Sequence, residues 1–211
     1  IWVAGDASHP YVKNITLKGG VGLYGGFAGG ETTRDQRDWK TNAAILDGGG
    51  SGNVVFAPAG ATATTVLDGF SIRNGSVGIY CYVSSPTITN NTISGNGETG
   101  IYCDSSSPSI TNNTISGNGE TGIECHGSPT ITNNTISGNG SAGIDCYGSP
   151  TITNNTISGN GTDGIAFYTP SPSTTTNTVA VTAHRGIHYK LSSPPITQHT
   201  IYAAVAVAIY I

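Results

Sequence analysis

The side chains best suited to chemistry are three carboxylates and an imidazole that recur at intervals of 21 or 22 residues. They are Asp104, Glu124, His126 and Asp145. Paired carboxylates of this kind can transfer protons or hold calcium. The equivalent positions elsewhere in the chain hold Tyr, Ala, His and Lys, and no Lys or Arg lies between residues 74 and 184 to stabilise a charged sugar. We therefore expect no catalytic residue, no metal and no cofactor, and hence no enzyme.

The cysteines form a second group at the same intervals, at Cys81, Cys103, Cys125 and Cys146. On neighbouring strands their Cα atoms would lie about 4.8 Å apart, and a disulfide accepts about 4.4 to 6.8 Å. Three arrangements remain open: Cys81–Cys103 together with Cys125–Cys146, a single Cys103–Cys125 bond, or four thiols packed as small apolar groups. A zinc site is not expected, because a flat ladder does not present tetrahedral ligands.

Both groups follow from an internal repeat. Four segments, beginning at Ser85, Ser107, Ser128 and Ser149, share the pattern Ser-Pro-(Thr or Ser)-Ile-Thr-Asn-Asn-Thr-Ile-Ser-Gly-Asn-Gly, and each is followed by a Gly-Ile pair. Apolar residues alternate with polar ones, as in a strand, and Asn-Asn, Gly-Asn-Gly and Ser-Pro are turn sequences. This short period without a helical segment predicts an all-β solenoid, a parallel β-helix of about nine coils with no capping helix.

Stacking of the coils in register places equivalent residues above one another. Isoleucines such as Ile88, Ile93 and Ile101 then form three inward columns. Side-chain amides at a turn can donate to and accept from their neighbours along the stack, so a buried polar column can satisfy itself. We expect such an asparagine ladder at Asn91, Asn113, Asn134, Asn155 and Asn177.

The composition excludes several classes of function. The 211 residues carry a formal charge of −4 with only 8 Lys and Arg, so a surface that follows nucleic-acid phosphates is not expected. The longest apolar run, residues 201–211, is too short for a membrane-spanning helix of about 20 residues, and we expect no membrane insertion. The chain opens on Ile1 without a signal peptide, which indicates either a removed leader or a piece of a longer product.

The repeat Ile-Thr-Asn-Asn-Thr-Ile-Ser-Gly-Asn-Gly-x-x-Gly-Ile resembles that of the right-handed parallel β-helix family, the pectate-lyase-like superfamily, over residues 66–211. Residues 20–39 and the segment Val66-Leu-Asp-Gly-Phe70 are similar to the opening coils of bacterial surface proteins of the polymorphic outer-membrane type. The resemblance implies a right-handed coil and an extracellular or cell-surface location. Many members of such families have no known enzymatic activity, and the fold alone does not decide function.

Two regions follow from these patterns. Residues 1–75 are expected to form irregular N-terminal coils, and their inserted loop, 29–42, holds three of the eight basic residues. We expect this loop to be structural and held by salt bridges. Residues 76–211 are expected to form regular repeats that end in an apolar, open coil.

The predicted ends of the rod lack the polar caps that solenoids normally need. Head-to-tail contacts that do not close generate filaments. We therefore predict an extracellular structural protein whose partner is a second copy of itself, in a head-to-tail filament or surface appendage. The expected assembly interface consists of Ile1, Trp2, Val3, Tyr202, Val205, Val207, Ile209 and Ile211.

Three other functions remain as alternatives. The first is a carbohydrate-binding or carbohydrate-active β-helix of the lyase or hydrolase kind, in which outward tyrosines stack on surface glycans. The second is a fragment of a surface adhesin. The third is an ice-binding protein, because outward Thr pairs resemble the flat grid of β-solenoid antifreeze proteins. Sequons that could carry glycans in a secreted protein begin at Asn14, Asn74, Asn90, Asn112, Asn133 and Asn154.

Overall fold

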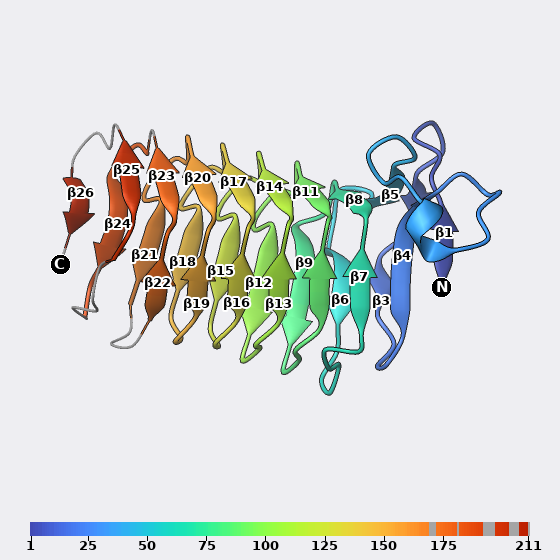
Figure 1. The fold of residues 1–211 in the computed structure, drawn as a ribbon, viewed down its shortest axis with the longest axis horizontal. Coiled ribbons are helices and arrows are strands. Elements are labelled where there is room, and N and C mark those ends of the chain that lie inside the picture. Colours follow the sequence, from blue (N-terminus) through green and yellow to red (C-terminus); the bar gives the residue numbers. More distant parts are fainter. Residues whose placement is uncertain (169–171, 181, 192–196, 203–206, 211) are drawn as a thin grey trace.

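The computed structural model describes residues 1–168, 172–180, 182–191, 197–202 and 207–210. Within these ranges the chain forms 26 short strands and one 3₁₀ helix, η1 (Arg34–Gln36), and contains no α-helix. The strands belong to three parallel sheets that run along a rod of stacked coils, with the two termini at opposite ends (Figure 1). The prediction of an all-β solenoid is therefore confirmed.

Each regular coil contributes one strand to each sheet. Sheet 1 contains β1 (Trp2–Ala4), β4 (Gly22–Phe27), β7 (Val66–Asp68), β10 (Thr87–Thr89), β13 (Ser109–Thr111), β16 (Thr130–Thr132), β19 (Thr151–Thr153) and β22 (Ser173–Thr175). Sheet 2 contains β2 (Tyr11–Val12), β5 (Ala44–Asp47), β8 (Phe70–Arg73), β11 (Thr92–Ser94), β14 (Thr114–Ser116), β17 (Thr135–Ser137), β20 (Thr156–Ser158), β23 (Thr178–Ala180) and β25 (Thr200–Tyr202). Sheet 3 contains β3 (Ile15–Thr16), β6 (Asn53–Ala57), β9 (Val77–Tyr82), β12 (Ile101–Asp104), β15 (Ile123–Cys125), β18 (Ile144–Cys146), β21 (Ile165–Phe167), β24 (Arg185–Tyr189) and β26 (Val207–Tyr210).

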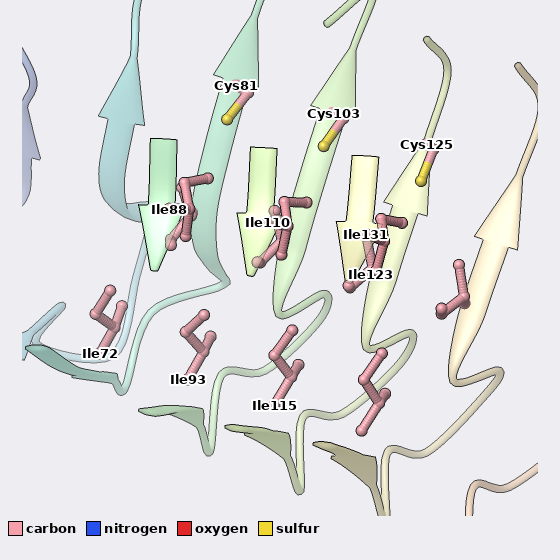
Figure 2. Packing of buried hydrophobic residues seen from close by; sticks show 14 of the residues in the cluster. Ile72, Cys81, Ile88, Ile93, Cys103, Ile110, Ile115, Ile123, Cys125 and Ile131 are labelled. Carbon is pink, nitrogen blue, oxygen red and sulfur yellow. The ribbon is translucent and has the colours of Figure 1, made fainter. Parts of the chain in front are cut away.

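The core is a set of identical side chains stacked in register. Ile88 pairs with Ile110, which pairs with Ile131, and each is completely buried. Sheet 2 and sheet 3 add parallel columns, and the three columns face one another inside the coil (Figure 2). Because burial of one isoleucine contributes about 1.5–3 kcal/mol, the columns supply the main stabilisation of a chain with few charges.

A ladder of buried asparagines lies at the turn between sheet 1 and sheet 2. The side-chain nitrogen of Asn113 donates to Oδ1 of Asn134 at 3.1 Å, and that of Asn134 donates to Oδ1 of Asn155 at 3.0 Å. The same amide of Asn134 also donates to the Ile110 carbonyl at 2.9 Å. The five residues expected to form this ladder are thus hydrogen-bonded from coil to coil, at Asn91, Asn113, Asn134, Asn155 and Asn177.

A second ladder, at the Gly-Asn-Gly turns, was not expected from the sequence. The side-chain nitrogen of Asn118 donates to Oδ1 of Asn139 at 3.0 Å, and that of Asn139 donates to Oδ1 of Asn160 at 3.0 Å. Asn96 begins this ladder, at 2.9 Å from Asn118. We interpreted Gly-Asn-Gly only as a turn sequence, although its alternating glycines leave room for an inward amide.

The backbone of the repeat requires particular residues at two places. The first Asn of each Asn-Asn pair is left-handed, with φ of 57° at Asn112 and 58° at Asn133, a conformation that Asn tolerates better than most residues. A Cβ atom at Gly122 would lie 2.6 Å from the carbonyl oxygen of Gly143 on the next coil. Glycine before the inward isoleucine therefore lets neighbouring coils approach.

The inserted loop, 29–42, packs across the first coils near η1 (Figure 1). Arg37 forms a buried ion pair with Asp68 at 2.6 Å and donates to the Gly25 carbonyl at 3.1 Å. Its guanidinium also lies 4.8 Å from the ring centroid of Trp39. The principal salt bridge thus joins the loop to the coils.

Candidate active site on sheet 3

The outward residues of sheet 3 differ from coil to coil, whereas its inward residues repeat. Strand register places Tyr80, Tyr102, Glu124 and Asp145 in one outward column, followed by Ala166. The neighbouring column begins with Tyr82 and Asp104 and continues through an imidazole and two phenol rings. We call this surface the Tyr–acid face; it comprises Tyr80, Tyr82, Tyr102, Asp104, Glu124, His126, Asp145, Tyr147, Tyr168 and Lys190.

Two carboxylates lie side by side on this face because Glu124 and Asp145 occupy paired positions of β15 and β18. Burial raises the pKa of Asp145 to about 6, and the negative charge of Glu124 adds to this effect. Oδ1 of Asp145 is buried without a hydrogen-bond partner among the described residues, and the carboxyl group accepts a hydrogen bond from Tyr168. Asp145 can therefore hold a proton near pH 6 beside a charged carboxylate, as a general acid requires.

Polar neighbours orient the other acidic groups. Nε2 of His126 lies 3.0 Å from Oε1 of Glu124. The hydroxyl of Tyr80 donates to Oδ2 of Asp104 at 3.1 Å. The four residues singled out for chemistry therefore lie on one face, but Asp104 is held by a tyrosine and only Glu124, His126 and Asp145 form a compact group.

In the carbohydrate-binding alternative the tyrosines stack on sugars, but several of their ring faces are occupied. His126 stacks on Tyr147 with ring centroids 4.6 Å apart, and Tyr147 stacks on Tyr168 at 4.4 Å. The ammonium of Lys190 lies 4.2 Å from the ring centroid of Tyr168 and covers the end of the stack. This half of the face can present ring edges and hydroxyl groups, which suit hydrogen bonding to a glycan better than stacking.

The sequence placed His188 and Lys190 in the two outward columns but did not show what these groups contact. Lys190 follows Tyr168 along the stack, and its charge opposes the rise in the pKa of Asp145. One coil beyond Ala166, His188 lies 3.1 Å from Oδ2 of Asp163, and Arg185 lies 3.6 Å from the same oxygen. The repeat predicts the column position of Lys190, and the structure adds its contact with the ring of Tyr168.

A cavity of about 270 Å³ opens on the N-terminal half of the Tyr–acid face. The rings of Tyr80 and Tyr102, with centroids 5.3 Å apart, form part of its lining. Glu124 belongs both to this cavity and to the carboxylate pair. The cavity therefore adjoins the carboxylate pair of Glu124 and Asp145. Its other lining residues are Asn53, Val77, Glu98, Thr99 and Glu120.

Two larger grooves, of about 490 and 450 Å³, flank Trp39 on the N-terminal coils. The first is lined mainly by amide and hydroxyl groups, such as those of Asn90 and Thr92. In the second, the guanidinium of Arg37 already pairs with Asp68. Neither groove combines a carboxyl group of raised pKa with a neighbouring charge, so both are less suited to chemistry than the Tyr–acid face.

All four cysteines are buried free thiols in one inward column beneath this face, and Figure 2 shows Cys81, Cys103 and Cys125. Cys103 lies between Tyr102 and Asp104 on β12, and Cys125 is the last residue of β15, between Glu124 and His126. A hydrogen bond with Cys81 and burial raise the pKa of the Cys103 thiol, and Cys146 acts in the same way on Cys125. Strand register pairs Cys103 with both Cys81 and Cys125, so the disulfide pairing stays a prediction.

The other residues expected to have a role lie elsewhere. Ile1 and Tyr202 are exposed, Trp2 stacks on Phe27 at 4.7 Å, and Val3 is half-buried. Val207 and Ile209 belong to β26, whereas Val205 and Ile211 lie outside the described residues, so the assembly interface stays a prediction. Five sequon asparagines are exposed and Asn90, which bonds to Asp68, is half-buried; the exposed ones are Asn14, Asn74, Asn112, Asn133 and Asn154.

Fold and face together define a parallel β-solenoid that carries a group of acidic and aromatic side chains on one sheet. A family model described as a right-handed β-helix region matches residues 41–153 and 77–211. The chain therefore belongs to the right-handed β-helix family, as its repeat indicated. No curated protein sequence matches it. The expected similarity to polymorphic outer-membrane-type proteins is not borne out by these matches and stays a prediction.

Two solved structures share the fold, and both are mutants of the periplasmic alginate epimerase AlgG. The double mutant is 19% identical with a TM-score of 0.53, over 79% of this chain and 48% of that chain. The single mutant is 14% identical with a TM-score of 0.56, over 91% of this chain and 59% of that chain. The chain thus spans about half the length of these enzymes, and identities this low establish the fold alone.

These similarities correct one expectation. We expected a protein without enzymatic activity. That prediction is contradicted, because both solved structures that share the fold are enzymes, alginate epimerases. The variation among the outward residues of sheet 3 suggested a solvated surface. The structure instead shows a carboxyl group with a raised pKa there.

In the part of the chain that the structure describes, no helix is long and apolar enough to cross a membrane. No group of three or more His, Cys, Asp and Glu side chains among the described residues is arranged to hold a metal ion.

Proposed function

We propose that this protein is a carbohydrate-active β-helix that cleaves glycosidic bonds of a polysaccharide on its Tyr–acid face. The observation that carries the proposal is the carboxyl group of Asp145, which has a pKa of about 6 and lies beside Glu124. One protonated and one charged carboxyl group are the pair that glycoside hydrolysis requires. The enzymatic relatives of the same fold support this choice over the filament subunit.

In the proposed reaction Asp145 donates its proton to the glycosidic oxygen as the C–O bond breaks. Glu124, hydrogen-bonded to His126, accepts a proton from the water that adds to the anomeric carbon. Elimination or epimerisation at a sugar acid is disfavoured, because these reactions need a cation to stabilise the carbanion next to the carboxylate. The nearest lysine, Lys190, is placed over the ring of Tyr168 instead.

Polysaccharides are outside most cells, so we infer that the protein works in the periplasm or outside the cell. The periplasmic origin of the structural relatives agrees with this inference. Glycans would then be its partners, and the head-to-tail filament stays an untested prediction.

The test is to measure new reducing ends on a panel of neutral, basic and acidic polysaccharides. We expect activity that Asp145→Asn lowers about 100- to 10,000-fold, as removal of a general acid does. Because the acid must be protonated, kcat/KM should fall above about pH 6. Thr153→Val, on sheet 1 of the same rod, is the matched control and should keep full activity. An Asp145→Asn variant as active as the parent would refute the proposal.

A further inference from the structure

The charged residues that line the cavity at Tyr80 and Tyr102 are all negative. Three of its eight lining residues are glutamates, and none is Lys or Arg. Glu98 and Glu120 occupy equivalent, exposed positions on consecutive coils, where the Glu120 amide donates to the Glu98 carbonyl at 2.9 Å. Glu124 completes the acidic lining at the edge nearest to Asp145.

Among the described residues, the one basic side chain paired with these glutamates is His126, which lies 3.0 Å from Glu124. Between residues 74 and 184 the chain holds six carboxylates and no Lys or Arg. The basic side chains that follow have partners of their own: Arg185 pairs with Asp163, and Lys190 lies over Tyr168. A negatively charged sugar acid in this cavity would therefore face repulsion from Glu98 and Glu120, which form no ion pair among the described residues.

The aromatic rings of the cavity favour the same kind of ligand as its carboxylates, a positively charged one. Tyr80 and Tyr102 are tilted by 43° to each other, and the hydrogen bond from Tyr80 to Asp104 fixes the first ring. Neither ring is stacked in parallel as those of Tyr147 and Tyr168 are, since Tyr80 also meets Phe56 at 5.7 Å and 36°, and Tyr102 meets His126 at 5.5 Å and 54°. An ammonium group is attracted to the face of an aromatic ring as well as to carboxylates.

We propose that this cavity binds a positively charged amino-sugar unit of the glycan, next to the bond that Asp145 and Glu124 cleave. The inference rests on the proposed function and specifies its substrate class: a basic polysaccharide with free amines rather than a sugar-acid polymer. The ammonium lies between the Tyr rings and the glutamates, and the sugar hydroxyls meet the phenol and amide groups around it. Since Glu124 belongs to both cavity and carboxylate pair, binding places the neighbouring linkage at Asp145.

The experiment compares three hexasaccharides as ligands of the full chain: glucosamine, N-acetylglucosamine and galacturonate. At low salt and about pH 5.5, where the amines are charged, the glucosamine hexamer should bind about tenfold more tightly than the acetylated one. The galacturonate hexamer should bind least. Added salt should reduce the advantage of the amine, because it screens exposed charges.

A charge-removing variant sharpens the test. Glu98→Gln/Glu120→Gln should lose most of the preference for glucosamine while its affinity for the acetylated hexamer is unchanged. Glu31→Gln/Asp35→Asn removes the same charge from the distant loop and should keep the preference. Tighter binding of the neutral or acidic hexamer than of glucosamine would overturn the inference and leave the proposed function intact. Failure to bind or cleave any of the three, or any polysaccharide of the panel, would overturn both.

Discussion

The strands of sheet 2 and sheet 3 belong to the same coils but differ in what repeats. In sheet 2 the sequence Thr-Ile-Ser is identical in β11, β14, β17 and β20. In sheet 3 the inward isoleucine and cysteine repeat, whereas the outward residue between them is Tyr, Glu and Asp in β12, β15 and β18. Stacking constrains what points inward, so only outward positions are free to vary. Sheet 3 is where this chain varies them.

We expect the largest loss of stability from a substitution in the asparagine ladder, where the repeat is uniform. Asn134→Ala removes hydrogen bonds to Asn113, Asn155 and the Ile110 carbonyl at once. It leaves buried donors and acceptors without partners, at about 1–3 kcal/mol each, so we expect the free energy of unfolding to fall by about 3–5 kcal/mol. Chemical denaturation measures this loss. The exposed neighbour Thr135→Ala should change stability by under about 0.5 kcal/mol, and equal effects of the two variants would refute the role of the ladder.

We expect an intermediate change in stability from the cysteine column beneath the Tyr–acid face. We propose that oxidative refolding joins Cys81 to Cys103 and Cys125 to Cys146, with oxidised glutathione accepting the two electrons and two protons of each bond. The oxidised protein should be about 4 Da lighter than the reduced one, and each bond closes a loop whose entropy is worth about 3 kcal/mol.

One variant separates the possible pairings. Cys103→Ala should keep the Cys125–Cys146 bond and leave Cys81 as the only free thiol. A single Cys103–Cys125 bond would instead disappear in this variant and leave three thiols. Thiol titration after denaturation distinguishes the two results, and four thiols in the refolded parent would exclude both pairings.

The two sheets also differ in how much the sequence predicts. The columns of Ile88, Asn134 and Cys103 could be predicted because the repeat length alone determines which residues stack. For the candidate site, the sequence could locate the residues but could not show that the pKa of Asp145 is raised. The raised pKa of Asp145 depends on its burial and on the charge of Glu124, and the hydrogen bond from Tyr168 on the next coil opposes the rise. The spacing of the repeat predicts which residues stack, but it does not predict how far a side chain is buried from solvent.

The smallest effect concerns the stability cost of Asp145 itself. Its pKa is about 6 in the folded protein and about 3.9 in an unfolded chain, so the folded protein binds the proton more tightly. This group therefore stabilises the fold fully below about pH 4, and its contribution is lost as the pH rises through about 6. Because the side chain keeps some contact with solvent, we expect the difference to be about 1–2 kcal/mol.

Asp145→Asn should consequently be more stable than the parent at about pH 8 by that amount, with little difference at about pH 4. Denaturation of both proteins at the two pH values isolates this group, because all the other titrations are common to them. The exposed Glu98→Gln variant should show no such change. An Asp145→Asn variant that is less stable at the higher pH would mean that the carboxylate supports the fold. A gain in stability together with a loss of activity would mark Asp145 as kept for chemistry, in contrast to the asparagines that are kept for stacking.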